Sequence, residues 1–228
     1  MTHWLRVFVF TLAFVAVAAC AAPQETCPPA SGIALQVLGS GGPIADDDRA
    51  STAYLVWVDG KSRFLVDVGG GAFLRFAEAG ASFSDLDFIG LSHFHTDHSA
   101  DFVALLKSGN FSGRERRLSV AGPSGDGPFP GLSAFLDSTI GPNGAYAYLS
   151  GYLDGSGGLA RLVAREVDEP ATVFGSPEEA VRVDAMQVPH GIVPALAVLV
   201  QVGDTRVVFA TDQNGSDPDF AEFAKGAD

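Results

Sequence analysis

The sequence has little cysteine and little positive charge. Two of its 228 residues are cysteine, and 14 Lys and Arg stand against 27 Asp and Glu, for a formal net charge of −13. Both cysteines, Cys20 and Cys27, precede the first predicted strand, so no disulfide framework joins the core. Because affinity for phosphate backbones depends on clustered cations, this composition predicts no nucleic-acid partner. The basic cluster at residues 114–117 also contains a glutamate.

A hydrophobic run long enough to span a membrane is also missing near the N-terminus. The apolar stretch Val7–Ala19 is shorter than the roughly 20 residues that a spanning helix needs. It follows Arg6 and ends in Val-Ala-Ala before Cys20, which resembles the cleavage box of bacterial lipoproteins. We therefore expect a signal peptide over residues 1–19 and an exported lipoprotein, periplasmic or on the cell surface, anchored through Cys20.

Residues 20–31 are rich in proline and small side chains, which is typical of a tether between an anchor and a domain. The lipid on Cys20 would then be the only contact with the membrane. Two alternatives stay open, namely an ordinary signal peptide that releases a secreted protein and an uncleaved hydrophobic anchor. No pattern in the sequence indicates an oligomeric state.

Residues 32–228 predict one domain in which strands alternate with short helices. That alternation favours a layered α/β architecture over an all-β sandwich. The expected strands cover residues 33–39, 51–60, 62–71, 87–93, 118–123, 179–190, 195–204 and 205–212, and the expected helices cover 73–79, 97–107, 131–140 and 217–225.

Three of the five histidines lie within six residues, in the run His93-Phe94-His95-Thr96-Asp97-His98. On an extended backbone His93 and His95 project to the same side, so they can bind one metal ion. Asp97 and His98 follow where the chain turns into a helix, and they can serve a neighbouring ion. Imidazole and carboxylate ligands suit zinc, with manganese or iron possible. A solvated polar strand end is the alternative.

His190 and Asp212 end later predicted strands. Taken alone, His190 is more often structural and Asp212 more often forms a turn. Together with the histidine cluster, both fall at strand ends, where a metal site would have to be. We therefore interpret both as metal ligands.

Five stretches carry a family resemblance: residues 37–42 (VLGSGG), 64–71 (FLVDVGGG), 90–98 (GLSHFHTDH), 188–191 (VPHG) and 209–212 (FATD). Together they resemble the metallo-β-lactamase fold superfamily, and within it the ribonuclease Z and arylsulfatase-like branch. The resemblance implies a four-layer αββα sandwich with two divalent metal ions, zinc first, in a cleft at one edge.

The resemblance also implies a role for each polar residue of these stretches. It assigns one metal ion to His93, His95 and His190, and the other to Asp97 and His98, with Asp212 bridging the two. Asp97 and Asp212 are also the implied catalytic residues. Asp67 is implied to orient one of the ligands. For Asp67, capping the glycine turn at residues 69–71 is an equal alternative. The branch has one more histidine downstream of the bridging Asp, and this sequence has none. A truncated C-terminus and a second site completed by solvent are the two explanations.

The implied activity is a hydrolase in which the metal centre activates water against a small anionic ester, a phosphodiester or a sulfate ester. A β-lactamase or another carbonyl-ester or amide hydrolase is the second possibility, although the resemblance makes a bridging Asp unusual there. A lipoprotein that binds metal without catalysis is the third.

Overall fold

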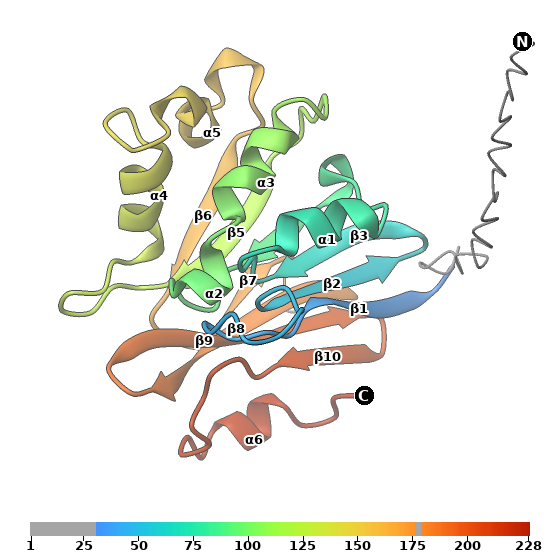
Figure 1. Ribbon diagram of the computed structural model, residues 1–228. Helices are drawn as coiled ribbons and strands as arrows, with labels where there is room; N and C mark the ends of the chain where they lie inside the picture. The colour runs from blue at the N-terminus through green and yellow to red at the C-terminus, as the bar shows by residue number, and fades with distance from the viewer. Residues whose placement is uncertain (1–30, 177–178) are drawn as a thin grey trace, which may run out of the picture.

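The computed structural model describes residues 31–176 and 179–228. The predicted signal peptide at residues 1–19, Cys20 and nearly all of the tether at 20–31 lie outside the described residues. Two β-sheets pack face to face, and helices cover their outer faces (Figure 1). In the part of the chain that the structure describes, no helix is both long and apolar enough to cross a membrane.

The first sheet has six strands in the order β1-β2-β3-β4-β5-β6. Its first three strands are antiparallel and the last three continue in parallel. Asp59 and Gly60 join β2 to β3 with φ angles of 49° and 73°, as a tight hairpin turn requires. The strands are β1 (Ile33–Gly39), β2 (Ala53–Val58), β3 (Lys61–Val66), β4 (Phe88–Gly90), β5 (Leu118–Pro123) and β6 (Leu162–Val167).

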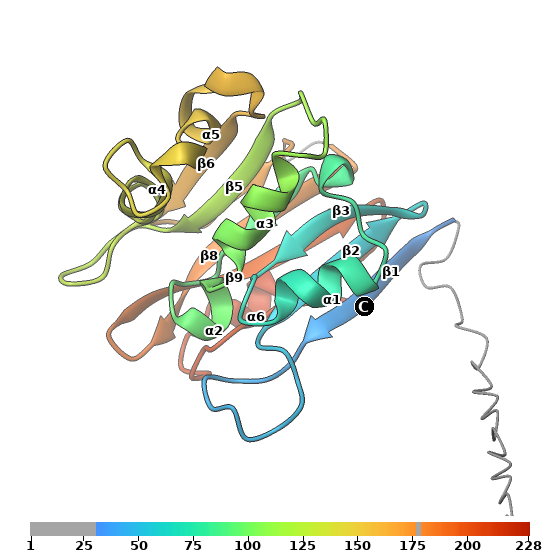
Figure 2. The same cartoon turned by 45° about the horizontal axis from the view of Figure 1, so that its top comes forward.

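Helices lie on one face of the first sheet (Figure 2). They bury a continuous apolar core against it, to which Phe76, Phe102 and Leu136 contribute fully or almost fully buried side chains. The helices are α1 (Ala72–Glu78), α2 (Thr96–Ser99), α3 (Phe102–Gly109), α4 (Leu132–Ile140) and α5 (Gly151–Asp154), with short 3-10 turns at Phe83–Asp85, Ala147–Leu149 and Ser156–Gly158.

The second sheet is antiparallel, in the order β10-β9-β8-β7. A second apolar core, with Phe64, Phe88 and Val198, fills the space between the sheets. On the outer face, the half-buried Phe220 and Phe223 of the single-turn helix α6 (Phe220–Phe223) pack against β8 and β9. The strands are β7 (Ala171–Phe174), β8 (Val181–His190), β9 (Val193–Val202) and β10 (Thr205–Phe209). The order of layers is therefore αββα, as predicted.

The helix expected over residues 97–107 is divided into α2 and α3. The backbone N–H of Asp101 donates to the carbonyl of Val68 at 3.0 Å, and its carboxylate accepts from the N–H of Phe73 at 3.0 Å. The Asp101 carboxylate thus satisfies a free backbone donor in the first turn of α1. The expected helix is interrupted at Asp101, between α2 and α3.

Other elements also differ from expectation. Strand β6 was not predicted, because it lies at a sheet edge with four consecutive exposed residues and has no apolar alternation. Strand β7 was missed as well. Strand β10 ends at Phe209, so Asp212 lies in the turn that follows, and α6 is shorter than the helix expected over 217–225.

Candidate metal centre

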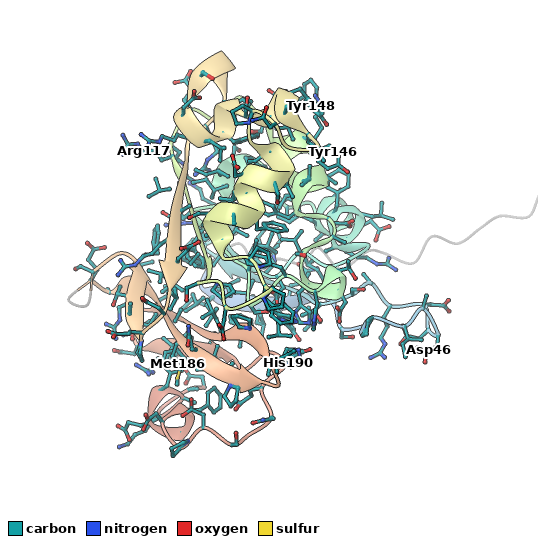
Figure 3. All side chains as sticks on the ribbon, turned by 90° about the vertical axis from the view of Figure 1, so that its left-hand side faces the viewer. Asp46, Arg117, Tyr146, Tyr148, Met186 and His190 are labelled. Carbon is teal, nitrogen blue, oxygen red and sulfur yellow. The ribbon has the colours of Figure 1, made fainter. Side chains whose placement is uncertain are left out.

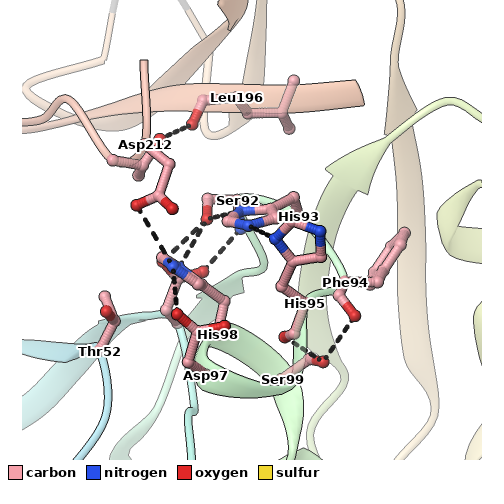
Figure 4. Close-up of polar contacts among 12 residues, drawn as sticks. Thr52, Ser92, His93, Phe94, His95, Asp97, His98, Ser99, Leu196 and Asp212 are labelled. Atoms are coloured by element: carbon pink, nitrogen blue, oxygen red, sulfur yellow. Dashed lines mark hydrogen bonds and ion pairs between the residues drawn. The ribbon is translucent and has the colours of Figure 1, made fainter. Parts of the chain in front are cut away.

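The predicted ligands meet at one edge of the sandwich. The segment between β4 and α2 carries His93 and His95, β8 ends at His190, and the turn after β10 carries Asp212. Parallel strands β3 and β4 deliver their carboxyl ends to the same edge, where α/β proteins commonly bind ligands. Figure 4 shows the side chains of this edge converging between the two sheets.

The first group of ligands consists of three imidazoles. One ring nitrogen each of His93, His95 and His190 lies within 4.8 Å of the others, a spacing that one metal ion can span. Nε2 of His93 is 3.0 Å from Nδ1 of His95. His93 is fully buried, whereas His190 is half-buried and His95 is exposed. The group is therefore buried on the side of His93 and open to solvent on the side of His95.

The second group combines His93, His98 and Asp212. One carboxylate oxygen of Asp212, Oδ1, lies 3.4 Å from Nε2 of His98, and the other, Oδ2, lies 3.8 Å from Nε2 of His190. The two oxygens of Asp212 thus face one imidazole of each group, which is the arrangement that a bridging carboxylate needs. Asp97 belongs to neither group in the described chain, but its Oδ2 lies 3.6 Å from Nε2 of His98.

Asp67 contacts His98, which belongs to the second group. Its fully buried carboxylate accepts hydrogen bonds from the N–H of Ser92 at 2.7 Å and the hydroxyl of Ser92 at 2.8 Å. The same carboxylate lies 2.8 Å from Nδ1 of His98. A carboxylate on the far nitrogen of a ligating histidine fixes the ring and its tautomer. The structure therefore places Asp67 where it can orient His98.

The backbone near the site is unusually constrained. A Cβ atom on Gly69 would lie 2.0 Å from the carbonyl oxygen of Asp97, so only glycine lets the turn after β3 approach the ligand motif. The N–H of Val68 also donates to the carbonyl of His98 at 2.8 Å. Thr211 has a φ of 52°, which is rare for a β-branched residue, and its hydroxyl donates to the carbonyl of Leu196 at 2.8 Å. That bond holds the turn from which Asp212 projects.

Burial and charge set the protonation of the histidines. Burial, followed by the neighbouring His98, His95 and His190, lowers the pKa of His93 from 6.5 to about 2, so this ring stays neutral. Burial alone would lower the pKa of His98, but the hydrogen bond with Asp67 and nearby carboxylates raise it overall. Burial likewise raises the pKa of Asp67. Independently of the charge on the ring, the contact between Asp67 and Nδ1 of His98 turns Nε2 of His98 toward the centre.

The side chains present fit a divalent metal ion. Among the described residues, Nε2 of His98 and Nε2 of His190 are buried without a hydrogen-bond partner. A buried polar atom without a partner is costly, and metal coordination would satisfy both nitrogens. Neutral imidazoles and carboxylates are the donor set that zinc, iron and manganese accept in proteins.

Ser92 also belongs to the centre, although its role was not predicted from the sequence. Its buried hydroxyl lies within hydrogen-bond distance of Asp67, of Nδ1 of His93 at 3.1 Å and of Nδ1 of His98 at 3.3 Å. Ser92 therefore links the two halves of the centre. Its position immediately before His93 in the motif was the available signal.

The family of the chain follows from comparison with known proteins. A model of the Metallo-beta-lactamase superfamily matches residues 46–221. The chain therefore belongs to this superfamily.

Two curated relatives and two solved structures are informative. Ribonuclease Z of Mycobacterium marinum is 38% identical over 96 residues, which are 41% of this chain and 34% of that protein. Ribonuclease Z of Clostridium acetobutylicum is 35% identical over 89 residues, 39% of this chain and 28% of that protein. The aligned segments thus span about a third of these relatives.

Among solved structures, the short form of human tRNase Z has a TM-score of 0.65 at 18% identity, covering 85% of this chain and 75% of the other. The metallo-beta-lactamase fold protein YhfI of Bacillus subtilis has a TM-score of 0.62 at 20% identity, covering 86% and 68%. The expected fold is thereby confirmed, and the ribonuclease Z relatives agree with the predicted class, a metallo-β-lactamase-fold hydrolase.

The prediction that nucleic acid is not a partner is wrong. The relatives and structural neighbours are named ribonuclease Z and tRNase Z, after RNA substrates. The net charge of −13 sums the whole surface, whereas binding of a phosphate at a metal centre depends on the local potential. Composition therefore could not exclude this substrate class.

Proposed function

We propose that this chain is a metal-dependent phosphodiesterase whose substrate is a nucleic acid, RNA first. The observation that carries the proposal is the position of Asp212, whose two oxygens face His98 and His190 at 3.4 Å and 3.8 Å. A carboxylate between two imidazole groups suits a centre with two divalent ions rather than one. The ribonuclease Z relatives support a phosphodiester as the bond that is cleaved.

In this proposal His93, His95 and His190 hold one ion, Asp97 and His98 hold the other, and Asp212 lies between them. Zinc is the proposed metal, because imidazole nitrogens dominate the donor set. When bound, two such ions supply Lewis acidity, lowering the pKa of a shared water and compensating the charge of the phosphate. Asp67 keeps the proton on Nδ1 of His98, so that Nε2 points to the centre.

The exposed side of the centre provides room for substrate. A cavity of about 460 Å³ opens beside His190, with Ser124, Asp126 and Gln187 among its lining residues. These side chains offer hydrogen-bond donors and acceptors to a polar chain such as a sugar–phosphate backbone. Sulfate esters share the anionic tetrahedral centre, and they are the second substrate class of the proposal.

The test is hydrolysis by the zinc-loaded protein, with bis(p-nitrophenyl) phosphate and an RNA oligonucleotide as phosphodiesters, p-nitrophenyl sulfate as the sulfate ester and nitrocefin as the β-lactam. We expect phosphodiester hydrolysis that falls at least about a hundredfold in His95→Ala, because one imidazole of the first group is lost. Phe111→Ala is the control. Lys107 lies over both the exposed ring of Phe111 and the ring of Tyr148. Tyr148 lies at the end of the molecule opposite His190 (Figure 3). Nitrocefin turnover without phosphodiester turnover would reject the proposal.

The proposed site of action is outside the cytosol, with the protein held by a lipid on Cys20. The supporting observation is the apolar Val7–Ala19 segment that ends before Cys20. An exported enzyme of this kind would meet extracellular or periplasmic RNA fragments.

A further inference from the structure

A second cavity adjoins the metal centre on the side of His95, and it is apolar. Its volume is about 160 Å³. Besides His95, it is lined by Phe94, Phe129, Pro130, Phe135, Val193 and Pro194. In Figure 4, Phe94 lies across His95 from Asp212 and His98. The cavity therefore extends from the first ligand group and away from the second.

One wall of this cavity consists of rings that hold each other in place. Phe94 stacks on Phe135 with a centroid distance of 4.4 Å and an interplanar angle of 11°. Phe135 in turn packs against the buried Phe102 of α3 at 6.2 Å. A Cβ atom on Gly122 would lie 3.3 Å from Cζ of Phe94, so glycine in β5 leaves room for this ring. This wall is aromatic, and its rings are held in place by packing.

A short hairpin contributes another part of the lining. The N–H of Phe129 donates to the carbonyl of Asp126 at 2.9 Å, and the N–H of Asp126 donates back at 3.1 Å. The carboxylate of Glu166 on β6 accepts from the N–H of Ser133 at 2.8 Å, just after this hairpin. These bonds fix the loop that presents Phe129 and Pro130 to the cavity.

The apolar and polar cavities share part of one wall. Val193 and Pro194 at the start of β9 line both of them. The polar cavity lies beside His190 and the apolar one beside His95, and both histidines belong to the first ligand group. A substrate bound at this group can therefore place a polar chain on one side and an apolar substituent on the other.

From this arrangement we propose that the apolar cavity binds a single aromatic ring of the substrate ester. This assignment rests on the proposed function, because the ester is the group held at the metal centre. A cavity of roughly 150 Å³ with apolar walls accommodates benzene, so the volume suits one six-membered ring. Aromatic walls favour a planar guest through stacking and edge contacts. A phenyl ester or a pyrimidine nucleotide would supply such a ring.

The test compares ligands that differ only in the ring. Calorimetry on the zinc-loaded protein measures the affinity of phenylphosphonate against that of methylphosphonate, neither of which is an ester. We expect phenylphosphonate to bind about tenfold more tightly, since it buries an apolar ring. A parallel pair, uridine 5′-monophosphate and ribose 5-phosphate, shows whether a pyrimidine base is accepted as well as a phenyl group.

Two variants change the cavity from opposite directions. Phe129→Ala removes part of one wall, and Val193→Phe fills the space. Both should reduce the preference for phenylphosphonate over methylphosphonate to less than about threefold. Phe111→Ala, an exposed phenylalanine outside both cavities, should keep the full preference. Circular dichroism checks that each variant is folded. If one variant misfolds, the test relies on the other.

The outcomes separate this inference from the proposed function. A phenyl preference without any phosphodiester hydrolysis would support the ring site and reject the proposed reaction. Phosphodiester hydrolysis with equal affinity for the two phosphonates would leave the reaction intact and overturn the ring site. A preference that survives in both Phe129→Ala and Val193→Phe would also overturn it, because the ring would then bind elsewhere.

Discussion

The carboxylate of Asp67 lies 2.8 Å from Nδ1 of His98, and both side chains are almost completely buried. This contact joins residues 31 positions apart in the chain and directs Nε2 of His98 toward Asp212. The metal centre therefore depends on a carboxylate that none of the proposed ligand sets includes.

Replacing Asp67 with asparagine should weaken zinc binding by about 10- to 100-fold, because the ring of His98 loses the charged partner that fixes its tautomer. Competition with a chromogenic chelator measures this affinity. Asp204→Asn, in the exposed turn between β9 and β10, is the matched control and should bind zinc normally. An unchanged affinity in Asp67→Asn would mean that Asp67 only caps the glycine turn.

Asp212→Asn should change the number of ions bound. The first group keeps its three imidazoles in this variant, whereas the second group loses its carboxylate. We expect the native protein to bind one zinc ion more tightly than a second, and the variant to keep only the tighter one. Titration calorimetry with elemental analysis of the dialysed protein gives both numbers. Two equally tight ions in the native protein would contradict the unequal sites.

Gly69→Ala should destabilise the fold as well as the centre. The added Cβ atom would lie 2.0 Å from the carbonyl oxygen of Asp97, so the turn after β3 must move away from the ligand motif. We expect a loss of about 3 kcal/mol or more in the free energy of unfolding, as for severe overpacking. Urea denaturation measures it. Gly42→Ala, where an added Cβ atom has nothing within 4 Å, should change the unfolding free energy little.

The histidine cluster could be predicted from sequence because its ligands are local. Residues 93–98 fold as one strand end and one helical turn, so their spacing alone indicates shared geometry. His190 and Asp212 could be added because strand ends meet at one edge. For Asp67, however, two roles remained open, since choosing between them requires a contact across 31 residues.

Features made by distant segments were not predictable in this way. The break between α2 and α3 depends on Asp101 reaching the N–H of Phe73, 28 residues away. Strand β6 has too few buried residues to show a pattern. The apolar cavity beside His95 combines the ligand motif, the loop before α4 and the start of β9, and no single stretch of sequence displays it.

Cys20→Ser tests the expected anchor. If Cys20 carries the lipid, the variant expressed in a bacterial host should move from the membrane fraction to the soluble exported fraction, because a hydroxyl cannot take the thioether-linked lipid. Immunoblotting of the fractions measures the shift. Cys27→Ser is the matched control and should stay with the membrane. Identical fractionation of the native protein and Cys20→Ser would rule out the lipid anchor.

In the metal-free protein, His93 should contribute a loss of stability as the pH falls below about 6.5. Burial lowers the pKa of His93 in the folded state from 6.5 to about 2. Between these values the unfolded chain binds a proton at this position and the folded chain does not, so protons favour unfolding. The contribution of His93 to the free energy of unfolding is present in full above pH 6.5. Below pH 6.5 it declines by up to about 1.4 kcal/mol per pH unit. Urea denaturation in EDTA at pH 7.5, 6.0 and 5.0 should therefore show a smaller decline in His93→Gln than in the native protein, whereas equal declines would show that His93 takes up a proton in the folded state.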